Sequence, residues 1–208
     1  MHKLFNWFGL PGKLILTSLI SLTAVVLSIA DPTLTRIVCI PAMLASSLGD
    51  IILMDYKPVT TRLPVRGFIA GASVFAFAHV IYFCAFLCSV KNYFNAGAWA
   101  GIALFVAVSA AVVVICRSSA SGTSTKDGKM LPLCILYLFF IALNYTTVYS
   151  CAAAHGGRFL ISAVGVTLFL ISDLFIVADS ILGAKIKNSD FWIWTFYPIG
   201  QILLLAGA

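Results

Sequence analysis

Aspartates lie inside two long apolar stretches of the sequence, where a charged side chain is unexpected. The stretch 34–54 contains Asp50, and the stretch 158–182 contains Asp173 and Asp179. An ionisable group within a lipid-spanning helix is costly, so it usually faces the interior of the helix bundle and has a partner or a function. Two such carboxyls in one site suit acid–base chemistry, in which one donates a proton and the other, ionised, accepts one.

Further polar side chains in or beside the apolar stretches are candidates for the same site. These candidates are His79, Tyr82, Tyr137, Asn144, Asp179, Tyr197, Gln201 and Lys13. Individually they also have structural explanations. A single histidine is more often a packing residue than a catalyst, and a lysine at a helix end can extend its ammonium to the lipid headgroups.

The composition identifies the apolar stretches as membrane segments. Hydrophobic residues make up 62% of the 208 residues and charged residues 10%, against about 45–50% and about 25% in soluble domains. Too few polar groups remain to cover a soluble surface. The net charge of +6 is therefore a signal of membrane topology rather than of nucleic-acid binding.

Seven stretches approach the length of a membrane helix, about 20 residues. They are predicted at residues 14–30, 34–54, 67–90, 96–116, 130–150, 158–182 and 191–207. The polar segment 117–129 is predicted to be a loop. We therefore expect an all-α integral membrane protein, a bundle of seven transmembrane helices in which residues 1–208 form a single domain.

The first stretch has a second interpretation. It follows Lys13 and ends in Ser28-Ile29-Ala30, which resembles a signal peptide with a small-residue cleavage site. Its seventeen uncharged residues exceed the usual signal core and approach the length that spans a bilayer. We therefore interpret it as the first helix of the mature protein.

The distribution of basic residues supports seven helices and orients them. With a cytoplasmic N-terminus, ten of the thirteen Lys and Arg residues fall on the inner side, and only Arg36, Lys91 and Arg158 fall on the outer side. Cytoplasmic loops of membrane proteins carry such an excess of Lys and Arg. The protein is thus predicted to be a multi-pass protein of the cell (inner) membrane, with its C-terminus outside.

Counting residues along the helices places the two aspartates at one depth. Asp50 lies fourteen residues after Arg36, and Asp173 lies fifteen after Arg158. At the helical rise per residue, both carboxyls are about 21–22 Å below the outer anchors, in the inner half of the membrane. On the same scale, Asp179 lies about 9 Å closer to the inner surface than Asp173 does.

The other polar candidates fall at graded depths. Tyr137 and Tyr197 lie nearly level with the aspartates, His79 and Gln201 lie nearer the middle, and Asn144 lies further out. The set describes a polar pocket open toward the cytoplasmic leaflet.

The alternative is that the aspartates near helix ends, Asp50 and Asp179, reach for headgroups and water. This alternative is weaker for Asp173, because no basic residue of the inner side follows it until Lys185.

Cysteine and glycine positions have simple structural interpretations. The six cysteines lie within apolar stretches without metal-binding spacing, so we interpret them as small apolar residues. Gly71 and Gly165 are predicted to let helices approach closely. No metal and no cofactor is expected.

Five short motifs occur in order over nearly the whole chain. They are Gly49-Asp50-x2-Leu53, Gly71-x3-Phe75-x3-His79-x2-Tyr82, Pro132-x4-Tyr137, Gly165-x3-Phe169-x2-Ser172-Asp173-x5-Asp179 and Tyr197-x3-Gln201. Together they resemble the lysoplasmalogenase (YhhN-like) integral membrane family. That family usually has eight helices and begins with a Lys-Pro pair, where this chain has Lys13-Leu14.

The resemblance implies an ether hydrolase that cleaves the vinyl ether bond of lysoplasmalogens to a fatty aldehyde and glycerophospho-ethanolamine or -choline. Protonation of the vinyl ether produces an oxocarbenium-like cation, which water captures, so one protonated carboxyl and one carboxylate are needed. We predict that Asp50 and Asp173 fill these two roles, in an order the sequence leaves open. His79 and Tyr197 are predicted to orient water or hold a proton.

The expected partners are a lysophospholipid substrate and membrane lipids, with no nucleic acid; the oligomeric state is left open. An amphiphile would reach a pocket in the inner half sideways from the cytoplasmic leaflet.

Asn144 and Gln201 are predicted to bind glycerol oxygens. The headgroup phosphate is predicted near Lys57, Arg62 and Arg66.

Other membrane functions also use buried acids. An intramembrane aspartyl protease is disfavoured because Ser47 replaces the first glycine of its GxGD motif and Ser172, rather than tyrosine, precedes Asp173. A receptor or retinal protein is disfavoured because the last helix contains no lysine. The stronger alternative is a non-enzymatic lipid or small-molecule carrier that uses the acids for proton coupling, with Pro41 as a possible hinge.

Overall fold

The computed structural model describes residues 9–63, 67–119, 131–180 and 187–208. In these ranges all regular secondary structure is helical, with no strand. Seven long helices are α2 (Leu10–Ala30), α3 (Leu34–Leu53), α5 (Gly67–Leu87), α6 (Ala96–Ser119), α7 (Leu131–His155), α8 (Arg158–Ser180) and α9 (Ser189–Ala206); α4 (Lys57–Thr60) is a single turn. The predicted all-α fold is confirmed.

Most predicted helix ends lie within a few residues of the observed ones. The largest differences are at α2, which begins at Leu10, and at α7, which continues to His155. The predicted loop 117–129 begins later, because residues 117–119 belong to α6; the rest of it, residues 120–129, lies outside the described residues. Helix α3 runs through Pro41 without interruption.

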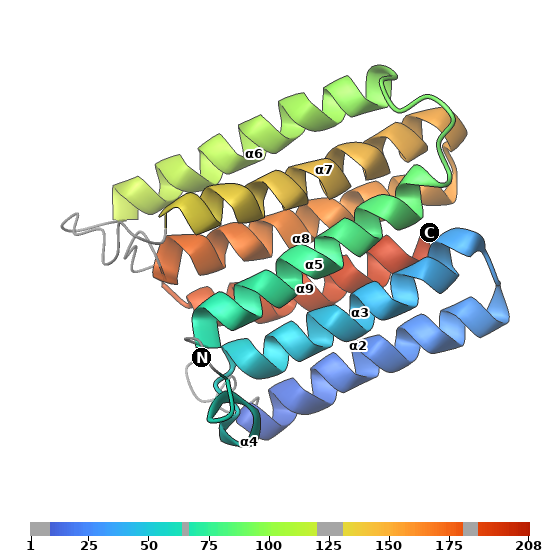
Figure 1. Cartoon of the computed structure of the whole chain (residues 1–208). Helices are drawn as coiled ribbons and strands as arrows, with labels where there is room; N and C mark the ends of the chain where they lie inside the picture. Colours follow the sequence, from blue (N-terminus) through green and yellow to red (C-terminus); the bar gives the residue numbers. More distant parts are fainter. Residues whose placement is uncertain (1–8, 64–66, 120–130, 181–186) are drawn as a thin grey trace.

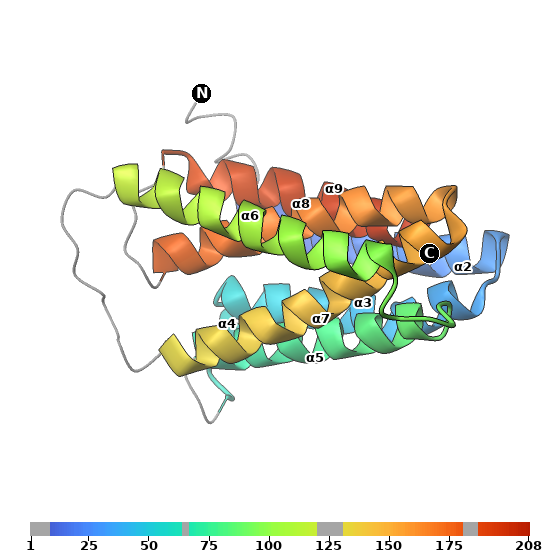
Figure 2. The same cartoon turned by 90° about the horizontal axis from the view of Figure 1, so that it is seen from above.

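The long helices lie side by side along a common direction (Figure 1), and their contacts close into a ring. Each packs beside its neighbours in the order α2, α3, α5, α7, α6, α8, α9, and α9 contacts α2 again. Seen from above, α6, α8 and α9 form one layer and α7, α5 and α3 the other (Figure 2). The first predicted helix is therefore a full member of the bundle.

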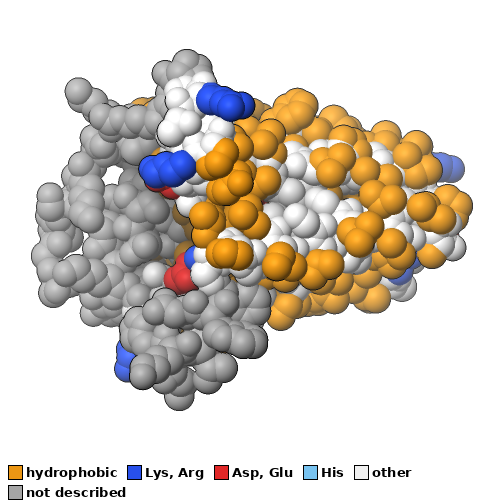
Figure 3. All heavy atoms as spheres, turned by 90° about the horizontal axis from the view of Figure 1, so that it is seen from below, with side chains coloured by type: hydrophobic (Ala, Val, Ile, Leu, Met, Phe, Trp, Pro, Cys, Tyr) orange, Lys and Arg blue, Asp and Glu red, His pale blue; other side chains and the backbone are white. Residues whose placement is uncertain are grey.

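Six helices of the described part, α2, α3, α5, α6, α7 and α8, are long and apolar enough to cross a membrane. Helix α9, which contains Asp190, Tyr197 and Gln201, is not among them, although it packs along α8 within the ring. Apolar side chains are spread along the coloured part of the face drawn in Figure 3, and Lys and Arg lie mainly toward the ends of that part. The chain is a multi-pass membrane bundle.

Basic side chains of the described part lie at both ends of the bundle. Arg158 and Arg36 both donate to Asp31 Oδ2, over 3.2 Å and 2.5 Å. The buried Arg36 also donates to the carbonyl oxygens of Leu205 (3.3 Å) and Ala206 (2.7 Å), which satisfies acceptors at the C-terminal end of α9. Arg36 thus stabilises a helix end instead of standing free as a surface anchor.

At the opposite end, Lys57 forms an exposed ion pair with Asp55. The hydrogen bond from Lys57 holds the pKa of Asp55 below its usual value. Several basic residues predicted at this end lie outside the described residues: Lys3, Arg66, Lys126, Lys129 and Lys185.

Two glycines bring α8 and α9 into backbone contact. A Cβ atom on Gly165 would lie 2.3 Å from the nitrogen of Leu204, and one on Gly200 would lie 2.8 Å from the carbonyl oxygen of Gly165. A Cβ on Gly71 would likewise lie 2.6 Å from the side chain of Leu53 on α3. The prediction that Gly71 and Gly165 allow close helix approach is confirmed.

Candidate active site

A cavity of about 280 Å³ lies between α2, α3, α5, α8 and α9. Both aspartates identified in the sequence, Asp50 and Asp173, line it. Their side chains are buried, whereas Asp190, which lines the cavity too, is 63% exposed. The cavity therefore extends from a buried pair of carboxyls to the surface at the end of the bundle where α2 begins.

The carboxyl of Asp50 is held by two hydroxyl groups from other helices. Thr17 Oγ1 on α2 donates to Asp50 Oδ2 over 2.5 Å, and the Tyr197 hydroxyl on α9 donates to the same oxygen over 2.8 Å. Thr17 and Tyr197 are buried as well. Three helices thus meet at Asp50, and one of its oxygens accepts two hydrogen bonds.

The carboxyl of Asp173 has a different environment. The Tyr137 hydroxyl on α7 donates to Asp173 Oδ2 over 2.9 Å. His79 Nε2 on α5 lies 3.5 Å from the same oxygen, and both residues are almost completely buried. Asp173 therefore combines one hydrogen bond with an imidazole placed to exchange a proton with it.

His79 is oriented by Asn144 and by an aromatic neighbour. Asn144 Nδ2 lies 3.3 Å from His79 Nδ1, and the ring of Phe169 packs 4.8 Å from the imidazole, centroid to centroid. An amide NH2 group can only donate, so Nδ1 is the acceptor and a neutral imidazole carries its proton on Nε2. That proton faces Asp173.

Behind the cavity lies a second polar contact between α5 and α9. The Tyr82 hydroxyl donates to Gln201 Oε1 over 2.7 Å, and both side chains are fully buried. Three polar atoms near the aspartates, His79 Nε2, Asn144 Oδ1 and Gln201 Nε2, are buried and make no hydrogen bond within the described part of the chain. Such atoms commonly bind water or a ligand.

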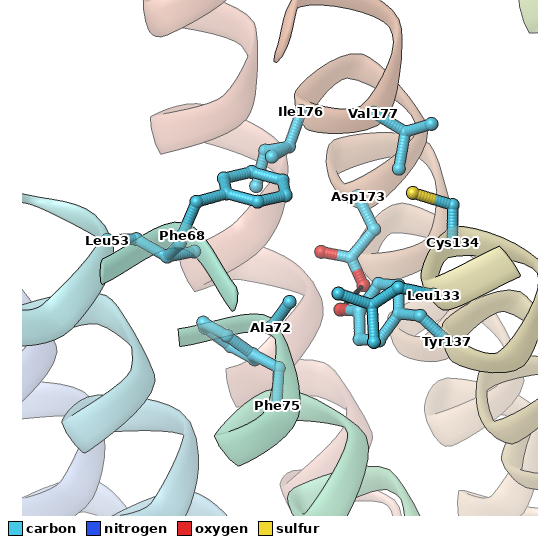
Figure 4. A pocket seen from close by; sticks show the side chains of 10 residues that line it. All are labelled: Leu53, Phe68, Ala72, Phe75, Leu133, Cys134, Tyr137, Asp173, Ile176 and Val177. Atoms are coloured by element: carbon cyan, nitrogen blue, oxygen red, sulfur yellow. Dashed lines mark hydrogen bonds between the residues drawn. The ribbon is translucent and has the colours of Figure 1, made fainter. Parts of the chain in front are cut away.

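A second, apolar pocket adjoins Asp173 between α5, α7 and α8. Figure 4 shows the Asp173 carboxyl pointing into this pocket beside Tyr137, with Cys134, Phe68 and Ala72 around it. The pocket encloses only about 30 Å³. It shares Asp173 and several apolar walls with the larger cavity, so Asp173 lies where a partly polar cavity and an apolar pocket meet.

The exposed end of the larger cavity carries an ion pair over an aromatic ring. Lys13 Nζ lies 2.6 Å from Asp190 Oδ1 and 5.0 Å from the centroid of the Trp194 ring. All three residues line the cavity. This end can therefore present one positive and one negative charge to a ligand.

Most site residues predicted from the sequence come together, in two layers. Lys13, Asp50, Tyr137, Asp173 and Tyr197 line one or both compartments. His79, Tyr82, Asn144 and Gln201 do not line either of them and lie behind the lining side chains. Helix α8 contains Asp179, whose side chain lies outside the described residues.

Two features of the site differ from the sequence-based expectation. Lys57 and Arg62, predicted near the headgroup phosphate, do not line the cavity, and Arg66 lies outside the described residues. Thr17 was not predicted as a site residue. Its position one helical turn after Lys13 places both side chains on the same face of the helix, and this spacing could have indicated it. Asp190 and Trp194 were also missed, because they lie near the helix end, where polar residues are common.

Comparison with protein families matches residues 13–208 to the YhhN family. The match includes every predicted site residue. No curated protein and no solved structure matched the chain. Since the matched segment covers nearly the whole sequence, the chain belongs to the YhhN family.

Proposed function

We propose that this protein is a lysoplasmalogenase of the cell (inner) membrane. It hydrolyses the vinyl ether bond of lysoplasmalogens and releases a fatty aldehyde and a glycerophospho-ethanolamine or -choline. The proposal rests on one observation above all: two buried carboxyls face one cavity, and Asp173 stands at its junction with an apolar pocket.

This arrangement matches the shape of the substrate. A lysoplasmalogen carries its vinyl ether between a polar glycerophosphate group and a long apolar chain. With the polar part in the larger cavity and the chain in the apolar pocket, the vinyl ether lies beside Asp173. Because the apolar pocket encloses about 30 Å³, the chain would enter by displacing side chains such as Phe68.

The hydrogen bonds support different roles for the two aspartates. Asp50 Oδ2 accepts from both Thr17 and Tyr197, a pattern that suits an ionised carboxylate. Asp173 accepts a single hydroxyl bond and faces His79. We therefore assign Asp173 as the general acid and Asp50 as the carboxylate that stabilises the cation and activates water.

In the first step, Asp173 gives its proton to the β-carbon of the vinyl ether. The π electrons form the new C–H bond, and the ether oxygen shares a lone pair with the α-carbon, which gives the oxocarbenium ion. A water molecule then attacks the α-carbon while Asp50 takes one of its protons. The product is a hemiacetal.

In the second step, the hemiacetal collapses. Its hydroxyl proton returns to Asp173, whose carboxylate the Nε2–H of His79 faces, while Asp50 gives its proton to the glycerol oxygen as the C–O bond breaks. The aldehyde and the glycerophospho-ethanolamine or -choline leave, one water molecule has been consumed, and both aspartates regain their starting states. Asn144 orients His79 in this scheme, instead of binding glycerol oxygens itself.

The test incubates the full-length protein, purified in detergent, with lysoplasmenyl-ethanolamine and measures aldehyde release. The variants Asp50→Asn and Asp173→Asn are expected to lose activity by about 10²–10⁴-fold, the usual contribution of a general acid or base. Asp55→Asn is the matched control, because Asp55 is exposed and paired with Lys57. A saturated lysophospholipid should release no aldehyde.

Two results would contradict the proposal: no aldehyde from the wild-type protein, or unchanged release from both aspartate variants. Uptake of the lipid into liposomes without chemical change would instead support a carrier that uses the buried acids for proton coupling.

A further inference from the structure

We propose that Lys13, Asp190 and Trp194 form a headgroup site that selects a zwitterionic phosphate–ammonium group over an acidic one. This inference rests on the proposed function for the identity of the lipid. It assigns the headgroup to the exposed end of the larger cavity, away from Lys57 and Arg62.

The charges at this end are already paired in a way that a zwitterion can exchange. Lys13 Nζ donates to Asp190 Oδ1 over 2.6 Å, with side chains 20% and 63% exposed. The phosphate of the headgroup would pair with Lys13, and its ammonium would pair with Asp190. One ion pair is then replaced by two, and no charge is left unpaired.

The ring of Trp194 adds a second contact for the ammonium. Lys13 Nζ already lies 5.0 Å from the ring centroid, so this ring accepts a cation in the observed structure. Ammonium groups, including quaternary ones, are attracted to tryptophan faces at such distances. Ethanolamine and choline headgroups both fit this chemistry.

The distance from the aspartates fits the length of the substrate. Lys13 lies one helical turn, about 6 Å, from Thr17, which bonds to Asp50. The ether oxygen and the phosphorus of a lysoplasmalogen are five bonds apart, about 6 Å when extended. Asp190 lies seven residues before Tyr197, about 10 Å along α9, which suits an ammonium placed beyond the phosphate.

Selectivity follows from Asp190. A phosphate monoester without the ammonium would also bind Lys13, but it would take away the partner of Asp190 and place like charges side by side. The acidic lipid should therefore bind more weakly than the zwitterionic one. A site with Lys13 but without Asp190 would prefer the acidic lipid.

The test measures equilibrium binding of non-hydrolysable lipids to the full-length protein in detergent. The probes are 1-O-hexadecyl-lysophosphoethanolamine, the corresponding lysophosphatidic acid and 1-O-hexadecylglycerol. The wild type should bind the zwitterion about tenfold more tightly than either other lipid. Asp190→Asn should remove the preference for the zwitterionic lipid over lysophosphatidic acid. Lys13→Gln should weaken binding of the zwitterionic lipid about tenfold.

The matched control is Asp55→Asn, which removes a lysine-paired carboxylate at the same end of the bundle that does not line the cavity. Asp55 has a φ of 55°, a conformation that asparagine tolerates. This control should keep the wild-type preference. A preference that survives Asp190→Asn, or equal wild-type binding of all three lipids, would overturn the inference.

Binding and catalysis fail separately in this design. If the wild type releases no aldehyde but loses its lipid preference on Asp190→Asn, the headgroup site stands and the proposed hydrolase activity does not. If aldehyde is released and Asp190→Asn leaves binding unchanged, the hydrolase stands and the headgroup site does not.

Discussion

Tyr197 offers a sharp test of how Asp50 is held. Replacing it with phenylalanine removes the hydroxyl that donates to Asp50 Oδ2 over 2.8 Å. The ring itself is retained, together with its edge-to-face contacts to Phe75 and Phe169, at centroid distances of 6.0 and 5.4 Å. The substitution therefore isolates one hydrogen bond to a carboxylate.

The expected loss can be worked out from that bond. A hydrogen bond to a charged group contributes about 1.5–3 kcal/mol, and each 1.4 kcal/mol corresponds to about a factor of ten in rate. Tyr197→Phe should therefore lower kcat for aldehyde release by about 10- to 150-fold. Thr17 still donates to the same oxygen, so the lower half of that range is expected.

The assay is aldehyde release in detergent, with thermal unfolding measured in parallel. The control is Tyr145→Phe, which also removes a hydroxyl from a buried tyrosine, here one that bonds to Thr167 over 3.1 Å, away from both compartments. It should keep the wild-type kcat. The reasoning is refuted if Tyr197→Phe retains wild-type kcat, or if the two variants lose activity equally.

Two further predictions concern the positioning of the site and the chain-binding pocket. Gly165→Ala places a Cβ 2.3 Å from a backbone nitrogen of α9, so α8 and α9 must separate. The free energy of unfolding should fall by about 1–3 kcal/mol, and aldehyde release should fall too. The control Gly67→Ala, whose Cβ would lie 3.7 Å from its nearest neighbour, should change neither. Cys134→Phe fills the apolar pocket beside Asp173 and should raise KM for long-chain substrates more than for short-chain ones. Cys84→Phe, on an exposed position, is its control, and equal KM values in both cysteine variants would contradict the placement of the chain.

Several features of this protein follow from local sequence alone. Helix positions could be predicted because each membrane crossing needs a long apolar stretch, and the charges between stretches alternate from side to side. Depth could be predicted because the rise per residue is set by hydrogen bonds within each helix. The common level of Asp50 and Asp173 was obtained in this way, and both residues do line one cavity.

Lateral arrangement could not be predicted in the same way. Which helices are neighbours, and how far each is rotated, depends on packing between side chains that are distant in sequence, such as the contact of Gly165 with Gly200. For this reason Thr17 was missed, and Asn144 was expected to face the substrate although it lies behind His79.

The sequence by itself therefore determined the membrane class, the approximate helix boundaries and the level of the acids, because these depend on composition and on the geometry of single helices. Only the tertiary structure decided which oxygen each tyrosine bonds to, that Asp173 lies between a partly polar cavity and an apolar pocket, and that Lys13 meets Asp190 across 177 positions of the chain. These contacts join different helices, and their rotation and spacing are set by the packing of the whole ring.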